Sequence, residues 1–369
     1  MAPLRVFHVA PDRFAELAGL PEQLPEGGFV WVGCARSVFE ASLAEVQAAL
    51  QRWNAAALVD LHVSDLLNAQ LPSHYDYTSW YDLLVFRRLA RAAGGDEVER
   101  GGTDNALAAA RAALEGIDTS PVGFAVFDRV LLTVHPPDCA VREHFAQRLA
   151  ALTAGSEGRG SARIPTTSAD LMLRMVNHMV DGYLELRRLL TRHLGHLQHM
   201  LLDPKSRFAD WRLLLEARAA LHLLEDTCED QRAAVQEWID ALDEWPDETE
   251  PERRRERELL RVRSRDVLEH VERVLAHVRR LEQSAGVAVQ MHFSALGQRT
   301  NDIMRTLTVL TAVFLPLNLI TGFFGMNFEF MPLIHTSTGL WTAVAVMVLV
   351  ALGLGWYFWR KRYLAETAP

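Results

Sequence analysis

The 369-residue chain has few cysteines and no excess of positive charge. Its three cysteines, Cys34, Cys139 and Cys228, lie far apart and form no CxxC pair. We expect reduced and mostly buried thiols in a cytosolic portion of the protein. The formal net charge of −9 argues against a nucleic-acid partner, because nucleic acids recruit a basic surface.

Recognisable catalytic motifs are also absent. The sequence contains no nucleophile elbow, phosphate-binding loop or catalytic metal motif, so we expect neither an enzyme nor a bound cofactor. The N-terminal stretch MAPLRVFHVAPDRF lacks the basic-then-apolar layout of a signal peptide. The absence of a signal-peptide layout predicts that the chain starts in the cytoplasm.

Charged residues are missing from two apolar runs near the C-terminus, 306–324 and 340–359. Each run is close to the roughly 20 residues that a helix needs to cross a bilayer core. Arginines precede the first run, basic residues follow the second, and the segment between them has no Lys or Arg. The positive-inside rule then places both chain ends in the cytoplasm of a multi-pass membrane protein, most simply in a bacterial inner membrane. The alternative is two buried core helices of a soluble protein.

The first part of the chain alternates strand-like and helical patterns. The runs GGFVWVGC and YDLLVFRRL favour strands, and a hairpin is expected with its turn near Asp128 and Arg129. The stretches VFEASLAEVQAALQRW and VREHFAQRLAAL have helical spacing, and AGSEGRGSARIP marks a boundary. We therefore expect an α+β fold made of an α/β cytoplasmic domain, a long-helix stalk, a transmembrane helix, an outer loop, a second transmembrane helix and a basic cytoplasmic tail. Their predicted bounds are 1–160, 161–305, 306–324, 325–339, 340–359 and 360–369.

Few helix breakers occur after about residue 166. Capping chemistry in TTSADL predicts a helix start, a second helix is expected from about Phe208 to Leu242, and a third runs from about Glu252 to Phe324. That third helix would be about 110 Å long at 1.5 Å per residue. Steps of four and three residues predict an apolar seam, and we expect neighbouring subunits to share so long a helix. The seam comprises Val267, Val271, Val274, Val278, Leu281, Ala285 and Ala288.

The same spacing continues into the first apolar run and selects mostly polar or small residues. A polar stripe on an intramembrane helix must face protein or water. A ring of identical helices would enclose water, whereas a Thr/Gly stripe that only packs helices together is the alternative. The stripe comprises Asn301, Met304, Thr308, Thr311, Leu315, Asn318, Gly322 and Gly325.

The segment after this helix, ITGFFGMNFEFMPLIHTSTGL, has one carboxylate, Glu329. Carbonyls at the helix C-terminus carry partial negative charge, and Asn327 adds neutral oxygen. Mg²⁺ gives up its waters reluctantly, so such a mouth suits a hydrated divalent cation. Pro316 removes one backbone hydrogen bond near Asn318.

The stretch NDIMRTLTVLTAVFLPLNLITGFFGMNFEFMP resembles the pore helix and Gly-Met-Asn signature of the CorA family of divalent-cation transporters, which includes the zinc-transporting ZntB branch. LHVSDLLNAQLPSHYDYTSWYDLLVFRRL resembles the family's cytoplasmic domain more loosely. The resemblance implies a homopentameric funnel in a lipid bilayer that passes Mg²⁺, with Co²⁺ or Ni²⁺ tolerated. The alternatives are Zn²⁺ transport, with proton coupling, and a non-conducting membrane-anchored scaffold.

By matched position, the resemblance assigns three groups of residues to the pore and one to regulation. Gly325, Met326 and Asn327 would form the selectivity ring; Asn301, Thr311, Asn318 and Gly322 would line the pore; Met304, Leu307 and Leu315 would form a hydrophobic gate. Asp266 matches a carboxylate that helps to bind regulatory Mg²⁺ between subunits in relatives, and its alternative is a solvated helix residue.

Three positions bear on the choice of ion. Leu333 follows Met331-Pro332 where Mg²⁺-transporting relatives often have Glu, and Asn318 stands where many have Thr. Met326 is retained, whereas the ZntB branch usually varies it. The sequence thus identifies a pore better than it identifies the ion.

The cluster His193, His196 and His199 is the remaining candidate for metal binding. Spacings of three allow neighbouring pairs to chelate but spread all three around a helix, and no HExxH motif is present. Surface or interface histidines are the favoured interpretation.

Overall fold

The computed structural model describes residues 4–91, 116–137, 139–153, 164–202, 211–245, 250–326 and 337–361. It divides into two compact units, Met1–Ala288 and Val289–Pro369. Helix α8 (Pro251–Phe324) contributes residues to both units.

The first unit is built on a mixed sheet with the strand order β2-β1-β3-β9-β8-β5-β4. Its central strands β3 and β9 are parallel, and every other neighbouring pair is antiparallel. The strands are β1 (Arg5–Ala10), β2 (Arg13–Leu17), β3 (Phe29–Ala35), β4 (His74–Tyr77), β5 (Asp82–Arg87), β8 (Pro121–Val126) and β9 (Val130–His135). A separate two-stranded ladder joins β6 (Ala90–Arg91) to β7 (Ile117–Asp118).

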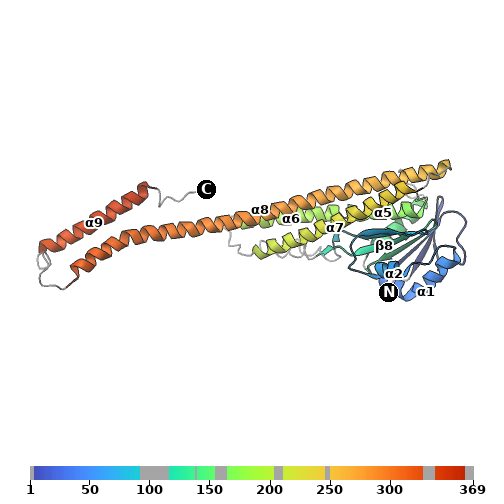
Figure 1. The fold of residues 1–369 in the computed structure, drawn as a ribbon, viewed down its shortest axis with the longest axis horizontal. Helices are drawn as coiled ribbons and strands as arrows, with labels where there is room; N and C mark the ends of the chain where they lie inside the picture. The colour runs from blue at the N-terminus through green and yellow to red at the C-terminus, as the bar shows by residue number, and fades with distance from the viewer. Residues whose placement is uncertain are drawn as a thin grey trace. The chain divides into compact units, whose positions relative to one another are not determined.

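Helices cover both faces of this sheet (Figure 1). Helices α1 (Arg36–Arg52) and α2 (Asp60–Leu67) bury Phe39, Leu50 and Leu66 against one face. Helices α4 (Val141–Thr153) and α5 (Ser168–Asp181) contact strands across the sheet, and α7 (Trp211–Glu244) contacts β4 and β5. Because the central strands are covered on both faces, they read as continuous apolar runs.

The predicted strands around GGFVWVGC and YDLLVFRRL are confirmed as β3 and β5, and the predicted hairpin is confirmed as β8 and β9. The N-terminal hairpin β1–β2 and the short helix α2 were missed, because neither gives a strong periodic signal. One predicted helix is two: α5 ends at Asp181, and α6 (Tyr183–Leu202) begins after Gly182. The predicted start at Phe208 lies outside the described residues.

The N-terminal cap of α5 follows the predicted chemistry. The Thr167 side chain accepts a hydrogen bond from the backbone N–H of Asp170 at 3.1 Å. Cys34 and Cys228 are buried free thiols and Cys139 is half-buried, as expected. Burial raises the pKa of Cys34 to about 12, so this thiol stays protonated and inert at neutral pH.

The predicted long helix is confirmed as α8, and its heptad seam is buried within this chain. Val267, Val271, Val278 and Ala285 are fully buried, in a part of α8 that hydrogen-bonds to α6 and α7. Gln198 on α6 donates to Ser284, and Arg218 on α7 donates to Glu282 at 2.7 Å. The chain's own helices therefore cover the seam, so the seam needs no neighbouring subunit; the expectation that neighbouring subunits share the long helix stays a prediction.

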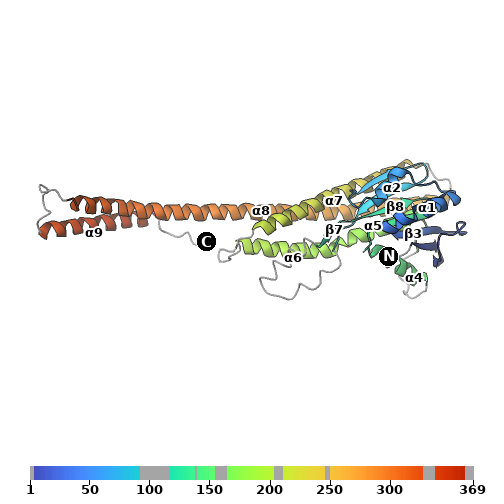
Figure 2. The ribbon, with the colours of Figure 1, turned by 90° about the horizontal axis from the view of Figure 1, so that it is seen from below.

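The second unit contains the C-terminal part of α8 and helix α9 (Ser337–Arg360). Both helices are long and apolar enough to cross a membrane, and little of either candidate span is buried. In both views α9 runs back beside the end of α8 (Figures 1 and 2).

Candidate ion pathway and other polar sites

Two different faces are visible along the membrane-length part of α8. Val309 is buried, and partly buried residues recur at Val313, Pro316 and Ile320. In the apolar run of α9, residues 340–359, Ala343 is buried. The four positions on α8 follow each other at steps of four, three and four residues and therefore share one face of the helix.

The predicted polar stripe lies on the other face of α8. Thr311 follows Val309 by two positions and is therefore about 200° away around the helix. All eight stripe residues are exposed in the single chain, as is the predicted gate residue Leu307. The gate residues Met304 and Leu315 are 63% and 69% exposed. Since α9 leaves this face uncovered, packing between α8 and α9 does not account for the polar stripe.

The threonine hydroxyls on this stripe point their protons back into the helix. Thr308 Oγ1 donates to the Met304 carbonyl at 2.8 Å, and Thr311 Oγ1 donates to the Leu307 carbonyl at 2.9 Å. Each hydroxyl oxygen keeps lone pairs for an outside donor, because its proton is used. The stripe therefore offers neutral oxygen acceptors, which suit water molecules around a cation.

The end of α8 requires glycine at position 325. The Gly325 N–H donates to the Thr321 carbonyl at 2.9 Å, and a Cβ at Gly325 would lie 2.9 Å from the same oxygen. Gly322, one turn earlier, has nothing within 4 Å of a Cβ position. Met326 is exposed, and the predicted ring residue Asn327 lies outside the described residues.

Asp266 lies in the first unit, on an exposed face of α8. Its carboxylate is 58% exposed and lies 3.9 Å from His270 Nε2, one turn along the helix. The other ring nitrogen of His270 is 3.1 Å from Asn177 Oδ1 and 3.9 Å from Asp181. Among the described residues no group of three or more His, Cys, Asp or Glu is arranged to hold a metal ion. His196 and His199 are exposed, as expected for surface histidines.

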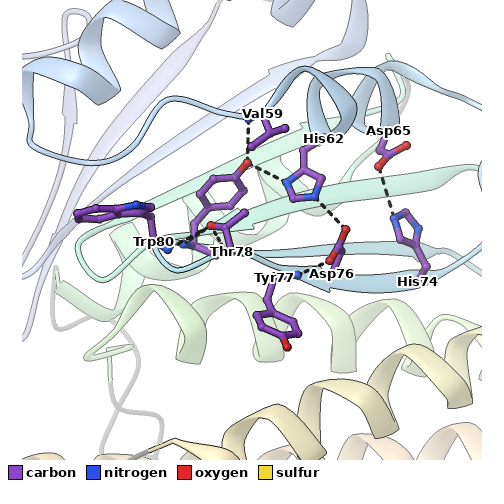
Figure 3. A network of polar contacts seen from close by, with 9 residues as sticks. Val59, His62, Asp65, His74, Asp76, Tyr77, Thr78 and Trp80 are labelled. Atoms are coloured by element: carbon purple, nitrogen blue, oxygen red, sulfur yellow. Dashed lines mark hydrogen bonds and ion pairs between the residues drawn. The ribbon is translucent and has the colours of Figure 1, made fainter.

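A second polar network was not predicted as a site and joins α2 to the edge strand β4 (Figure 3). Buried His62 lies 2.8 Å from the Tyr81 hydroxyl and 3.0 Å from Asp76 Oδ2. A parallel pair places His74 Nε2 3.8 Å from Asp65. The signal in the sequence was the alternation of His and Asp in HVSDLLNAQLPSHYD, which here fastens a short helix to an edge strand.

The carboxyl ends of the parallel strands hold a buried histidine among arginines. His135 is 2% exposed, and its Nε2 lies 2.9 Å from Thr133 Oγ1. Burial first, and then the charges of Arg142, Arg36 and Arg88, lower the pKa of His135 to about 3. The ring is therefore neutral in the folded state at physiological pH.

This histidine predicts a loss of stability in acid. The unfolded chain takes up its proton near pH 6.5, whereas the folded chain does so near pH 3. The contribution of His135 to the free energy of unfolding is thus fully present above pH 6.5. Below pH 6.5 it falls by up to about 1.4 kcal/mol per pH unit. Thermal unfolding of the full chain between pH 7.5 and 5 should show a smaller loss for His135→Gln. His222→Gln, on an exposed histidine, should keep the parent's pH dependence; equal slopes for all three proteins would contradict this role of His135.

Together these features define a membrane protein with a large α/β domain and two C-terminal spans, one of which carries an uncovered polar face. A family model described as CorA-like Mg²⁺ transporter protein matches residues 105–362, which is more than half of the chain. The chain belongs to this family, as its Gly-Met-Asn signature predicted, and the family is one of transporters rather than enzymes.

Curated relatives and a solved structure agree with this assignment. The cobalt/magnesium transport protein CorA of Thermotoga maritima is 32% identical over 100 residues, which cover 27% of this chain and 28% of the relative. The magnesium transport protein CorA of Yersinia pseudotuberculosis is 36% identical over 101 residues, which cover 27% and 32%. The chain thus matches about a third or less of the length of these relatives.

The predicted fold class is confirmed by a solved structure. The complete structure of the CorA magnesium transporter from Methanocaldococcus jannaschii matches 98% of this chain and 98% of its own chain, with a TM-score of 0.73. The sequence identity is 17%, so this likeness shows the fold.

Proposed function

We propose that this protein conducts divalent cations, with Mg²⁺ first, through a pore formed by a homopentamer in a lipid bilayer. The observation that carries the proposal is the exposed polar stripe on the face of α8 that α9 leaves uncovered. Hydrated polar groups in a bilayer need water or protein around them, and several copies of α8 around an axis would supply both. The curated relatives named as magnesium or cobalt/magnesium transport proteins support the choice of cargo.

Each of the three groups of residues that the resemblance assigns has a role in this pore. Gly325, Met326 and Asn327 form the outer ring that receives the hydrated ion. Asn301, Thr311, Asn318 and Gly322 line the pathway with oxygens and small side chains. Met304, Leu307 and Leu315 form a constriction that closes by dewetting.

Neutral oxygens favour an ion that keeps its waters. The C-terminal carbonyls of α8 carry about half a negative charge and face the outer ring. Mg²⁺ holds its first water shell tightly, so an outer ring without fixed charge binds the hydrated ion and releases it. Inward flow follows from the membrane potential, which contributes on the order of 4–5 kcal/mol per divalent ion at 100 mV. The basic residues that flank the two spans support cytoplasmic chain ends and a bacterial inner membrane.

Uptake by proteoliposomes tests this function. The purified full chain should pass Mg²⁺ and Co²⁺ along an inside-negative potential, and Asn327→Ala should lose most of the flux. Raising Mg²⁺ on the side of the first unit should inhibit the parent, and Asp266→Asn should need a higher concentration for the same inhibition.

The same assay decides between the rival functions. A Zn²⁺ flux that depends on a pH gradient would show that the protein is a proton-coupled Zn²⁺ transporter rather than a Mg²⁺ transporter. No flux of Mg²⁺, Co²⁺ or Zn²⁺ would leave a membrane-anchored scaffold. Unchanged inhibition of Asp266→Asn would make Asp266 a solvated helix residue.

A further inference from the structure

A cavity of about 320 Å³ lies in the first unit, and none of its lining residues belongs to the proposed pore. It is lined by α4, α5 and α8, and its polar wall includes Arg148, Arg174 and Arg263. Its volume is at the lower end of the range for pockets that hold small molecules. A basic lining of this kind is unexpected in a protein whose net charge is −9.

One buried carboxylate holds two of these arginines in place. Asp170 accepts from Arg174 Nε at 3.3 Å and from Arg174 Nη2 at 3.0 Å. Arg263 forms an ion pair with Oδ1 of the same carboxylate. Two guanidinium groups therefore share one negative charge, and the shared charge fixes their positions beside the cavity.

Positive charge is in excess among the described residues around the cavity. Arg148, on α4, adds a third guanidinium, whereas Asp181 is the second carboxylate besides Asp170. Counted over the described residues, three guanidinium groups face two carboxylates, Asp170 and Asp181. Burial lowers the pKa values of Arg174 and Arg263, which means that their charges are incompletely solvated. An additional anion would compensate for this lost solvation.

The rest of the lining combines neutral polar groups with flat aromatic rings. The lining residue Phe145 meets the lining residue His178 edge-on at 5.7 Å. Behind the lining, the ring of His144 stacks on His178 at 4.1 Å with 6° between their planes. Burial, followed by the neighbouring His144, lowers the pKa of His178. A neutral His178 and the Asn177 amide can therefore hydrogen-bond a ligand without adding charge.

We propose that this cavity binds a small molecule that carries a phosphate or carboxylate group. Guanidinium groups match both oxyanions through paired N–H donors, and this pairing is strongest where the groups are fixed and partly desolvated. The volume fits a metabolite-sized anion rather than a polymer.

Isothermal titration calorimetry on the detergent-solubilised full chain tests the proposal. The probes are inorganic phosphate, citrate and adenosine 5′-monophosphate at constant ionic strength without Mg²⁺, with adenosine as the uncharged control. At least one anion should bind, and adenosine should not. Phosphate binding without citrate binding assigns a phosphoryl ligand, and the reverse assigns a carboxylate.

Two variants of the exposed Arg148 separate this site from binding elsewhere on the surface. Arg148→Gln should weaken the affinity about tenfold or more, because a charge-assisted hydrogen bond contributes roughly 1.5–3 kcal/mol. Arg148→Glu should weaken it further. Arg52→Gln, on an exposed arginine of α1, should bind like the parent. No binding of any of the three anions at millimolar concentration, or parental affinity in Arg148→Gln, would overturn the proposal.

Discussion

Replacing Asn318 with leucine is expected to lower Mg²⁺ flux by about 10- to 100-fold. Asn318 is exposed on the stripe face of α8, where its amide would replace part of the interactions of a hydrated cation. A hydrogen bond to a charged partner contributes roughly 1.5–3 kcal/mol, and each 1.4 kcal/mol corresponds to a factor of ten. Initial rates of Mg²⁺ uptake into proteoliposomes, at equal protein density, measure the effect.

Two threonines supply a matched control for this prediction. Thr311 lies on the stripe, whereas Thr306 precedes it by five positions and lies about 140° away around the helix. Both hydroxyls donate at 2.9 Å to a carbonyl four residues earlier, so Thr→Val removes the same internal hydrogen bond from each. Thr311→Val should lower the flux, and Thr306→Val should keep it. Equal effects at the two positions would show that the stripe does not line the pathway.

Alanine at Gly325 and at Gly322 is expected to act by different routes. The Cβ of Gly325→Ala would meet the Thr321 carbonyl at 2.9 Å, so the end of α8 must shift even in a single chain. Gly322→Ala meets nothing within 4 Å, and alanine stabilises an exposed helix by about 1 kcal/mol relative to glycine. Gly325→Ala should therefore lower both the thermal unfolding midpoint and the flux.

Gly322→Ala should leave the unfolding midpoint unchanged or slightly raised while it lowers the flux. Such a result would support an assembly in which Gly322 of several copies approaches one axis, since a methyl group at Gly322 meets nothing within 4 Å in the single chain. Parental flux and parental stability together in Gly322→Ala would remove this glycine from the pore lining. Thermal melting in detergent and uptake in liposomes are measured on the same preparations.

The exposure of the stripe residues in the structure separates two explanations of the stripe that its composition leaves open. A polar face on an apolar helix serves equally well for packing and for a pore. The eight stripe positions are all exposed, whereas Val309 on another face of α8 is buried. Packing within the chain is therefore excluded as the reason for the stripe among the described residues, and contact with other copies or with water remains.

Local sequence patterns predicted most of the helices and strands named above, because these patterns depend on interactions between residues close together in the chain. Charge-free runs, the Gly-Met-Asn signature, the Thr167 cap and the strand-rich stretches act over a few residues. The family assignment rested on such patterns and is confirmed. The role of Asn327 and the choice of ion stay predictions.

The same local patterns did not predict which distant segments of the chain pack against each other. The heptad seam from Val267 to Ala288 predicted a helical partner but not which one, because any apolar helix surface satisfies the spacing. The chain's own helices bury that seam. Likewise, Asp170 and Arg174 were visible as neighbours four residues apart, whereas Arg263 is 93 residues from Asp170 in the sequence.

The sequence by itself determined the two membrane-length helices, the long α8, the central strands and the polar stripe, since each follows from the order of apolar and polar residues. Only the tertiary structure decided which face of α8 is left uncovered, that the seam is satisfied within one chain, and that three arginines surround one cavity. The physical reason is that burial and charge pairing depend on which surfaces meet in space, and many surfaces share the same local pattern.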